Sequence, residues 1–410
     1  MPDTNQPRLL SFTLDDWAVL GGRVSVSLTD GVAVLVGRNG AGKSAILEGF
    51  EAISLRPIGR SPRTRPTDGD SIPKVLEIEV STPNDRRLEY KYELKSLPIS
   101  ADDLDIDDSE NSNLEESQFS WNEHCRYTDR EKELLWTTEA GATTFNHGVW
   151  PITTFLGNTS FLRQSYPPEN SPIMLPADEM QWVYAVLKGV RVLGKNQGRQ
   201  MFRQRRPSLV RVSGRGVSPN LSGIADTLAL KIFRRAETEE LEELEGVCQR
   251  VGLGSKIVIQ KFILTGESRD TTEGESKEYV ASVLLDGVNV GLLSDGTLRV
   301  LSILIELIFS SPKFSMTAII EEPETQIHPG MLAKLLNEIE AYTFGENLIL
   351  STHSPQVVAW TKPDKINLVD RNNGRTIIRK LGEGKMHNVV EYLCEEGNLG
   401  EWIYSGILDD

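Results

Sequence analysis

The sequence contains no long apolar segment and few cysteines. No run of about 18 or more apolar residues occurs, which excludes a transmembrane helix. Residues 1–8 are polar and provide no apolar core for a secretion signal. The three cysteines lie far apart without a Cys-x-x-Cys pair, which argues against a disulfide framework or a structural zinc site. These absences predict a cytoplasmic protein that does not bind a membrane.

Charge is distributed unevenly along the chain. Acidic residues number 59 and basic residues 44, so the formal net charge is −15. Residues 101–117 contain eight acids and no base, and we expect this acidic tract to be disordered because it cannot bury enough apolar surface. Residues 180–225 contain nine Lys or Arg and no acid. The local charges therefore say more about partners than the acidic average does.

Strand and helix patterns alternate at both ends of the chain. Apolar–polar alternation and short apolar runs predict strands over residues 9–17, 24–28, 32–36, 75–80, 88–97, 256–265, 278–285, 318–320 and 348–351. Helical spacing predicts helices up to about residue 55 and over residues 177–193, 221–251, 296–309 and 329–344. A hairpin is expected over 365–381. The alternation predicts an α/β core with parallel strands.

The middle of the chain interrupts this alternation. We expect residues 1–95 and 236–410 to form one head, a mixed sheet with flanking helices, to which both ends of the chain contribute. Residues 96–235, which include the acidic tract, are then expected to form an inserted α+β lobe.

The first motif that carries chemistry is GRNGAGKS, which fits the phosphate-binding pattern G-x-x-x-x-G-K-[ST]. It lies between a predicted buried strand and a predicted helix, as such a loop must. Its glycines let successive N–H groups turn around a phosphate, and the following helix adds its positive end. We expect Lys43 to reach the β- and γ-phosphates and Ser44 to bind Mg²⁺. The predicted nucleotide-binding residues are Gly37, Arg38, Asn39, Gly40, Ala41, Gly42, Lys43 and Ser44.

Two adjacent carboxylates end a predicted buried strand in the sequence AIIEEPE. Ligands bind at the carboxyl ends of strands in open α/β sheets. We expect Glu321 to stabilise Mg²⁺ through its water shell and Glu322 to orient the attacking water. The strand over 348–351 delivers His353 to the same edge, where we expect it to contact the γ-phosphate. His328 either has a direct role or packs the turn.

The sequence LLSDGTLR opens another predicted helix. Ser294 or Asp295 is a good N-cap, and this structural explanation suffices on its own. Ser294, Asp295 and Gly296 at a helix N-terminus also form a second anion site. Because one phosphate loop hardly needs two anion sites for one nucleotide, we expect the second site to cap the ATP held by a neighbouring copy of the chain.

The order GRNGAGKS, LLSDGTLR, AIIEEPE and STHSP resembles the ATP-binding cassette (ABC) superfamily. More narrowly, the sequence is similar to the AAA-labelled ATPases of bacterial anti-phage systems. Their ATPase cores resemble those of the overcoming-lysogenisation-defect nucleases and of SMC-type proteins. The resemblance covers residues 9–55 and 285–380. It implies an ABC-type P-loop head with these assignments: Walker A, 37–44; signature, 294–297; Walker B with its catalytic glutamate, Glu321 and Glu322; switch histidine, His353.

The sequence departs from the superfamily pattern in two respects. Glu321 stands where transporters usually carry Asp, which puts the metal geometry in doubt. No Gln loop is identifiable, and Gln164 is only a candidate. Phe12 and Trp17 are candidates for the ring that stacks on adenine.

The resemblance implies an ATPase that uses ATP and Mg²⁺ and forms homodimers or larger assemblies. It would sense infection and control an effector encoded nearby, such as a nuclease. A DNA-repair or recombination ATPase and an ATP-dependent scaffold with little turnover remain alternatives. GTP specificity, suggested by T-K-P-D at 361–364, is discounted because no D-x-x-G follows the phosphate loop at the required distance.

The basic stretch over residues 188–215 has three interpretations. Its side chains would face the phosphates of a nucleic acid, although only Trp182, Tyr184 and Phe202 accompany them for base stacking. Alternatively, they dock the acidic tract of a second copy or a partner protein, or they form a solvated face.

Overall fold

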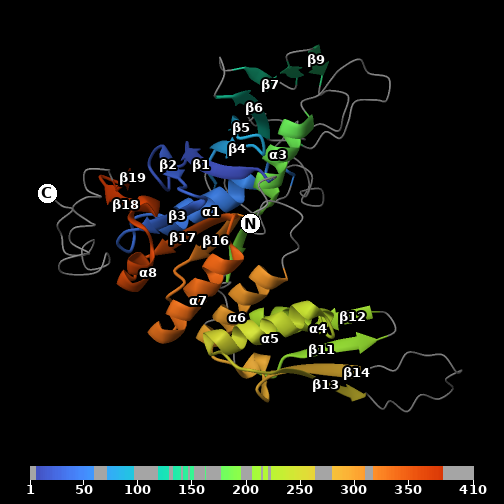
Figure 1. Ribbon diagram of the computed structural model, residues 1–410. Helices are drawn as coiled ribbons and strands as arrows, with labels where there is room; N and C mark the ends of the chain where they lie inside the picture. Colours follow the sequence, from blue (N-terminus) through green and yellow to red (C-terminus); the bar gives the residue numbers. More distant parts are fainter. Residues whose placement is uncertain are drawn as a thin grey trace, which may run out of the picture. The chain divides into compact units, whose positions relative to one another are not determined.

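The computed structural model describes residues 6–59, 72–96, 119–128, 133–139, 142–145, 148–151, 162, 177–194, 206–213, 216–219, 223–263, 279–309 and 317–381. The chain divides into two units (Figure 1). Unit 1 comprises Met1–Val192, Pro312–Ile319 and Gly345–Asp410, and unit 2 comprises Leu193–Ser311 and Ile320–Phe344. These boundaries fall at other positions than the predicted ones, and the inserted lobe over 96–235 remains a prediction.

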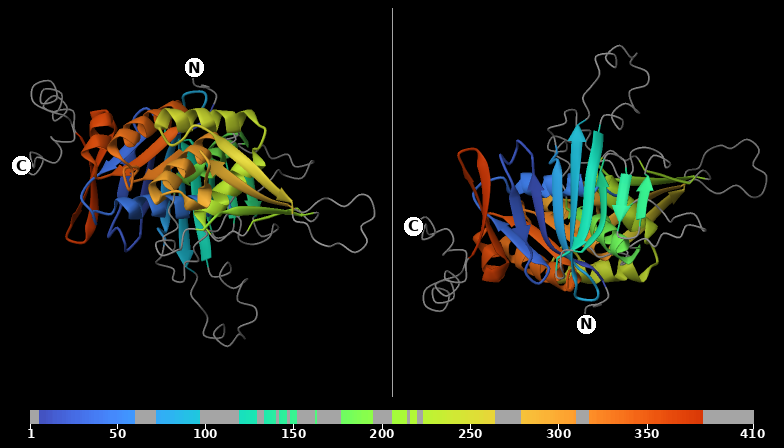
Figure 2. Two further views of the ribbon diagram at one scale, coloured as in Figure 1. Left: turned by 90° about the horizontal axis from the view of Figure 1, so that it is seen from below. Right: turned by 90° about the horizontal axis from the view of Figure 1, so that it is seen from above.

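The larger sheet of unit 1 is antiparallel, with eight strands in the order β2-β1-β4-β5-β6-β7-β8-β9 (Figure 2). The strands are β1 (Arg8–Asp15), β2 (Val24–Ser27), β4 (Val75–Ser81), β5 (Arg87–Ser96), β6 (Phe119–Tyr127), β7 (Leu134–Glu139), β8 (Ala142–Phe145) and β9 (Gly148–Pro151). In β4, Leu76 and Ile78 are buried while Glu77 and Glu79 are half-buried, as expected of a sheet with one face on the core. The strands predicted up to residue 97 are confirmed.

The second sheet has six strands in the order β10-β16-β17-β3-β18-β19. They are β10 (Val190–Leu193), β16 (Thr317–Glu321), β17 (Asn347–Thr352), β3 (Val32–Val36), β18 (Ile366–Asn372) and β19 (Arg375–Lys380). Strands β17, β3 and β18 run parallel, and β19 returns antiparallel to β18. Asn347 Nδ2 donates to Thr317 Oγ1 at 3.3 Å, so β17 and β16 begin at the same edge. The α/β core with parallel strands is confirmed.

The core of unit 1 lies around helix α1 (Lys43–Ser54), between the helix and strands of both sheets. Phe50 of α1 stacks on Phe12 of β1, with ring centroids 4.0 Å apart and an interplanar angle of 18°. Gly49 faces Trp17 so closely that a Cβ atom there would lie 2.6 Å from the indole. Ile319 and Ile349 join the same apolar cluster from the second sheet. Burial of these side chains therefore fixes the helix that follows the phosphate loop.

The helix predicted over 177–193 is too long. Helix α3 (Ala177–Lys188) ends before Gly189, and β10 begins at Val190. Glycine destabilises a helix interior and the β-branched Val190 and Val192 favour a strand, so the chain changes conformation at this point. A short helix α8 (Pro355–Trp360) and a 3₁₀ turn (Pro363–Lys365) complete the helical elements described in this unit.

Unit 2 contains an antiparallel sheet covered on one face by helices (Figure 1). Its strands, in the order β12-β11-β14-β13 with β15 on β14, are β11 (Leu209–Ser213), β12 (Gly216–Pro219), β13 (Ile257–Ile263), β14 (Tyr279–Leu285) and β15 (Val288–Asn289). The helices are α4 (Ile224–Arg234), α5 (Glu239–Val251), α6 (Asp295–Ile308) and α7 (Pro329–Tyr342). Among the residues that the structure describes, no helix has the length and apolar character needed to cross a membrane.

Candidate functional site

The phosphate loop connects the buried strand β3 to α1 in unit 1. Gly40 and Gly42 have φ angles of +82° and +106°, which glycine adopts at little cost. Gly42 is also the N-cap of α1, so no side chain occupies the N–H groups of the first turn. A helix that starts in this way presents its N–H groups and its positive end to an anion.

Residues of the β18–β19 hairpin pack against the phosphate loop. A Cβ atom on Gly37 would lie 2.1 Å from the carbonyl oxygen of Val369, and one on Gly42 would lie 2.5 Å from Thr376 Oγ1. Thr376, which is 3% exposed, donates from Oγ1 to the carbonyl oxygen of Ala41 at 3.2 Å. These contacts from the hairpin hold the backbone of the loop, and a side chain at Gly37 or Gly42 would collide with them.

Lys43 lies inside the loop that precedes it. Its side chain is 4% exposed, and Nζ donates to the carbonyl oxygens of Gly37 and Arg38 at 2.7 and 3.1 Å. Ser44, the next residue, is exposed in the first turn of α1. The amine of Lys43 is therefore held against the predicted phosphate loop by backbone oxygens of that loop.

His353 leaves the sheet beside the phosphate loop. In the parallel register of β17 and β3, Thr352 pairs with Val36, so His353 and Gly37 are the next residues of adjacent strands at the same edge. Thr352 Oγ1 accepts from the N–H of Ser354 at 2.9 Å, which turns the chain into α8. His353 is exposed there. The structure thus brings the predicted histidine and the predicted loop together within unit 1.

Thr376→Val is expected to weaken ATP binding about fivefold, the equivalent of one hydrogen bond of about 1 kcal/mol. Valine has the shape of threonine but cannot donate to the Ala41 carbonyl. The dissociation constant of a fluorescent ATP analogue measures the effect. Thr376→Ser, which retains the hydroxyl, should bind as the wild type does. Equal affinity of the valine and serine variants would show that this hydrogen bond does not support the loop.

The two acidic residues follow the buried part of β16 and are described within unit 2. Glu321 is the last residue of the strand, and Glu322 has a φ angle of +43°, which is uncommon for a residue with a side chain. Thr325 Oγ1 donates to Glu322 Oε2 at 3.3 Å. Arg299 Nη2 donates to the carbonyl oxygens of both glutamates. Sequence reasoning missed Arg299, although an arginine near the start of the mainly apolar segment 298–308 was a signal.

Helix α6 begins at the predicted cap. Ser294 is its N-cap, and its Oγ accepts from the N–H of Thr297 at 3.1 Å and lies 2.7 Å from Thr297 Oγ1. Ser294 and Asp295 are exposed. Gly296 packs against the turn after β16, because a Cβ atom there would lie 2.1 Å from the carbonyl oxygen of Gln326. The serine therefore has a structural role, and its exposed hydroxyl also lies at a helix N-terminus.

The predicted metal ligands, Ser44 and Glu321, are of the type and number that Mg²⁺ commonly takes from a protein. Within the described ranges, no group of three or more His, Cys, Asp or Glu side chains is placed to hold a metal. Ser44 and Glu321 offer oxygen donors only. Magnesium commonly takes one or two protein oxygens and completes its shell with water and substrate phosphates, so this donor set fits.

Other predicted residues have structural surroundings. Phe12 and Trp17, the two candidates for stacking on adenine, are buried in the core, 1% and 9% exposed. His328 caps α7, with Nδ1 accepting from the N–H of Gly330 at 3.2 Å. Thr361 Oγ1 donates to the carbonyl oxygen of Val357 at the end of α8, a structural role for this threonine of the T-K-P-D sequence.

Several predictions fall wholly or partly outside the described residues. These are the acidic tract, Gln164 and five of the nine bases of the basic stretch. Of its described members, Arg206 pairs with Asp226 at 3.6 Å, and Lys188 Nζ lies 5.2 Å from the Tyr184 ring centroid. Two basic side chains of the stretch thus contact groups of this chain.

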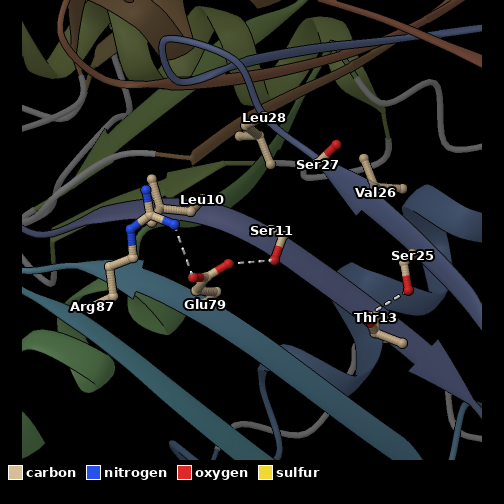
Figure 3. Close-up of a pocket in the computed structure, with 9 residues that line it drawn as sticks. All are labelled: Leu10, Ser11, Thr13, Ser25, Val26, Ser27, Leu28, Glu79 and Arg87. Carbon is tan, nitrogen blue, oxygen red and sulfur yellow. Dashed lines mark hydrogen bonds and ion pairs between the residues drawn. The ribbon is translucent and has the colours of Figure 1, made fainter. Parts of the chain in front are cut away.

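A shallow pocket on the antiparallel sheet of unit 1 lies apart from these motifs in the sequence (Figure 3). It is lined by Leu10, Ser11, Thr13, Ser25, Val26, Ser27, Leu28, Glu79 and Arg87. Arg87 pairs with Glu79 at 3.6 Å, and the Thr13 and Ser25 hydroxyls bond at 2.8 Å. Five of its polar side chains thus bond to one another, with Ser11 donating to Glu79 at 3.5 Å, and none of the predicted site residues lines it.

One protein family matches part of the chain. The family model described as "AAA domain, putative AbiEii toxin, Type IV TA system" matches residues 247–359, about a quarter of the sequence. This segment includes the cap of α6, both glutamates and His353, whereas the phosphate loop precedes it. No curated protein matches the sequence. Residues 247–359 are thus similar to an AAA domain, and the strand, loop and helix around Lys43 have the arrangement of a P-loop.

Several solved structures are similar to the chain over most of its length. One is the Smc head domain from Pyrococcus furiosus, with an extended coiled coil, bound to the C-terminal domain of ScpA. It is 11% identical to this chain, with a TM-score of 0.40, and the match covers 95% of this chain and 100% of that one. The SMC head domain from Thermotoga maritima is 12% identical (TM-score 0.36; 92% and 99%). A nucleotide-free ATP-binding cassette from an ABC transporter is also 12% identical (TM-score 0.38; 93% and 95%).

Proposed function

We propose that the chain is an ABC-type ATPase that serves as the regulatory subunit of a bacterial anti-phage system. The observation that carries the ATPase proposal is the phosphate loop, with Lys43 Nζ at the carbonyl oxygens of Gly37 and Arg38 and His353 on the neighbouring strand end. A polyphosphate tail is the ligand that such a loop accommodates, because it offers oxygens to several inward N–H groups at once.

The proposed chemistry follows from the order of the strands. Strand β16 neighbours β17 and starts at the same edge, so Glu321 and Glu322 come at the carboxyl end of a strand in the sheet that carries the phosphate loop. Glu322 would orient a water molecule and accept its proton as the water attacks the γ-phosphorus. Lys43 and His353 would stabilise the charge that develops on the γ-phosphate oxygens. Ser44 and Glu321 would hold Mg²⁺, which supplies further neutralisation when bound.

The proposed pocket is completed by a second copy. The exposed Ser294 at the N-terminus of α6 would cap the γ-phosphate held by the neighbouring chain, and each chain would contribute a loop and a cap. Such an arrangement makes hydrolysis depend on assembly, since an isolated copy lacks the donors supplied in trans. A subunit of this kind couples its association state to ATP turnover, which suits a regulator.

The defence role is supported by the motif order and by the family description. That description names a putative toxin of a type IV toxin–antitoxin system. We infer that the chain holds an effector protein encoded nearby, such as a nuclease, and releases or activates it on infection. We expect the product of a neighbouring gene to co-purify with the chain. Its association with the chain should weaken during ATP turnover or when a phage component is added.

A DNA-dependent ATPase is the second candidate, favoured by the nine bases and no acids of residues 180–225. Arg206 already pairs with Asp226, so the informative variant is Arg203→Glu with Arg205→Glu. Loss of a DNA-stimulated ATPase rate in that variant would favour this function. A scaffold with little turnover would instead assemble with ATP and show the same negligible phosphate release with or without Glu322.

Phosphate release by the wild-type chain tests the ATPase proposal itself. We expect turnover with ATP·Mg²⁺ that rises more than linearly with protein concentration, because the pocket needs two copies. Chelation of Mg²⁺ should remove the turnover. Absence of both ATP binding and phosphate release at micromolar protein concentrations would refute the proposal.

A further inference from the structure

Arg299 is a buried cation on the helix that carries the cap. It lies in the second turn of α6 and is 7% exposed. Burial lowers the pKa of its guanidinium, while the nearby carboxylates Glu321, Glu324 and Glu322 act in the opposite direction. A buried cation is costly unless its donors are used, and the hydrogen bonds of Arg299 Nη2 go to backbone carbonyl oxygens.

These carbonyl oxygens flank one residue. The carbonyl of Glu321 belongs to the peptide bond before Glu322, and the carbonyl of Glu322 belongs to the peptide bond after it. Arg299 Nη2 donates to both, the second at 2.9 Å. One nitrogen atom thus links the two peptide planes on either side of the Glu322 Cα, where φ is +43°. Such a backbone conformation persists only where surrounding contacts determine it.

A second contact joins the same helix to the same turn. Gly296 lies so close to Gln326 that a Cβ atom would approach its carbonyl oxygen to 2.1 Å. The turn between Glu322 and Gln326 is closed by the N–H of Thr325, which donates to the carbonyl oxygen of Glu322 at 3.0 Å. The first two turns of α6 therefore contact residues 321–326 at two points, and all of these residues belong to unit 2. A displacement at the start of the helix would reach the Glu322 backbone directly.

We propose that Arg299 is a positioning residue that couples the cap at the start of α6 to the water-orienting carboxylate of Glu322. When Ser294 engages a phosphate, a shift of α6 moves the two peptide planes that Arg299 holds and sets the direction of the Glu322 side chain. ATP held by one copy would then activate the glutamate of the copy that caps it. This inference rests on the proposed function and adds a regulatory connection to it.

Arg299→Met tests the coupling, because methionine fills similar space without donors. We expect kcat for ATP to fall about 10- to 100-fold while KM and the affinity for a fluorescent ATP analogue change less than about threefold. Arg299→Lys should recover part of the rate. The control is Arg250→Met, which breaks the ion pair of Arg250 with Glu338 in the same unit and should leave kcat unchanged.

A double-mutant cycle separates coupling from a general structural effect. If Arg299 acts through Glu322, adding Arg299→Met to Glu322→Gln should not lower the residual rate further. A kcat within threefold of wild type in Arg299→Met, or a further loss of similar size in the double variant, would overturn the inference. If Arg299→Met does not fold, Gly296→Ala replaces it, with the same kcat loss expected and an unchanged kcat overturning the proposal. Absence of turnover in the wild type would instead refute the proposed function.

Discussion

Lys43→Ala is expected to abolish detectable ATP binding and to lower ATP turnover by at least about 100-fold. The lysine amine is held by the Gly37 and Arg38 carbonyl oxygens at the position where the phosphate tail would enter, and in the proposed reaction it offsets the charge that grows on the γ-phosphate. Alanine leaves the loop backbone in place but removes this charge. Calorimetric titration with ATP·Mg²⁺ and phosphate release measure the two losses separately.

The matched control for this substitution is Lys91→Ala. Lys91 is a lysine of unit 1 that pairs with Glu77 at 3.2 Å on the antiparallel sheet, and its loss should change neither binding nor turnover measurably. A Lys43→Ala protein that binds ATP as tightly as Lys91→Ala would show that the loop does not hold the phosphates.

Glu322→Gln is expected to lower kcat by about 100- to 1000-fold while ATP binding is retained. Glutamine keeps the size of the side chain and can still accept from Thr325 Oγ1, whose bond to Oε2 is 3.3 Å long. It cannot take a proton from the attacking water. Because ATP would then persist in the pocket, the variant should also accumulate as a self-associated form in ATP·Mg²⁺, measured by light scattering after size exclusion.

Glu340→Gln is the matched control for Glu322→Gln. Glu340 is exposed on α7 in the same unit, and removal of its charge should leave kcat and the oligomeric state as in the wild type. Near-wild-type turnover in Glu322→Gln would assign the catalytic base to another group. It would also favour the scaffold interpretation if assembly were unchanged.

Local patterns in the sequence were sufficient to predict the strands and the helix next to the phosphate loop. The continuous apolar run over 32–36 became β3 with the same bounds, and the glycines of the next six residues permit the tight turn into a helix. The strand predicted over 348–351 became the parallel neighbour of β3, which carries His353 to the loop. These features depend on side-chain period and on glycine conformation, both of which are visible in short windows.

The parts that could not be predicted depend on contacts between distant segments. Phe12 and Trp17 were candidates for adenine stacking, but Phe50 and Gly49 of α1 pack against them in the core. The same limit applies to Arg299, whose partners are 22 and 23 residues away in the chain. Support of the loop by Thr376 likewise joins segments 335 residues apart.

Mixing two inactive variants tests the shared pocket most directly. Lys43→Ala has a defective loop and an intact cap, whereas Ser294→Asp has an intact loop and a cap whose negative charge repels the γ-phosphate. Aspartate is as good an N-cap as serine, so α6 should still form. Each variant alone should be nearly inactive.

In an equal mixture, half of the dimers are mixed and each has one intact pocket of two, so the account predicts about a quarter of the wild-type phosphate release. A mixture no more active than the sum of its two components, with both variants folded, would contradict a pocket built from two chains. Wild-type activity of Ser294→Asp alone would contradict it as well.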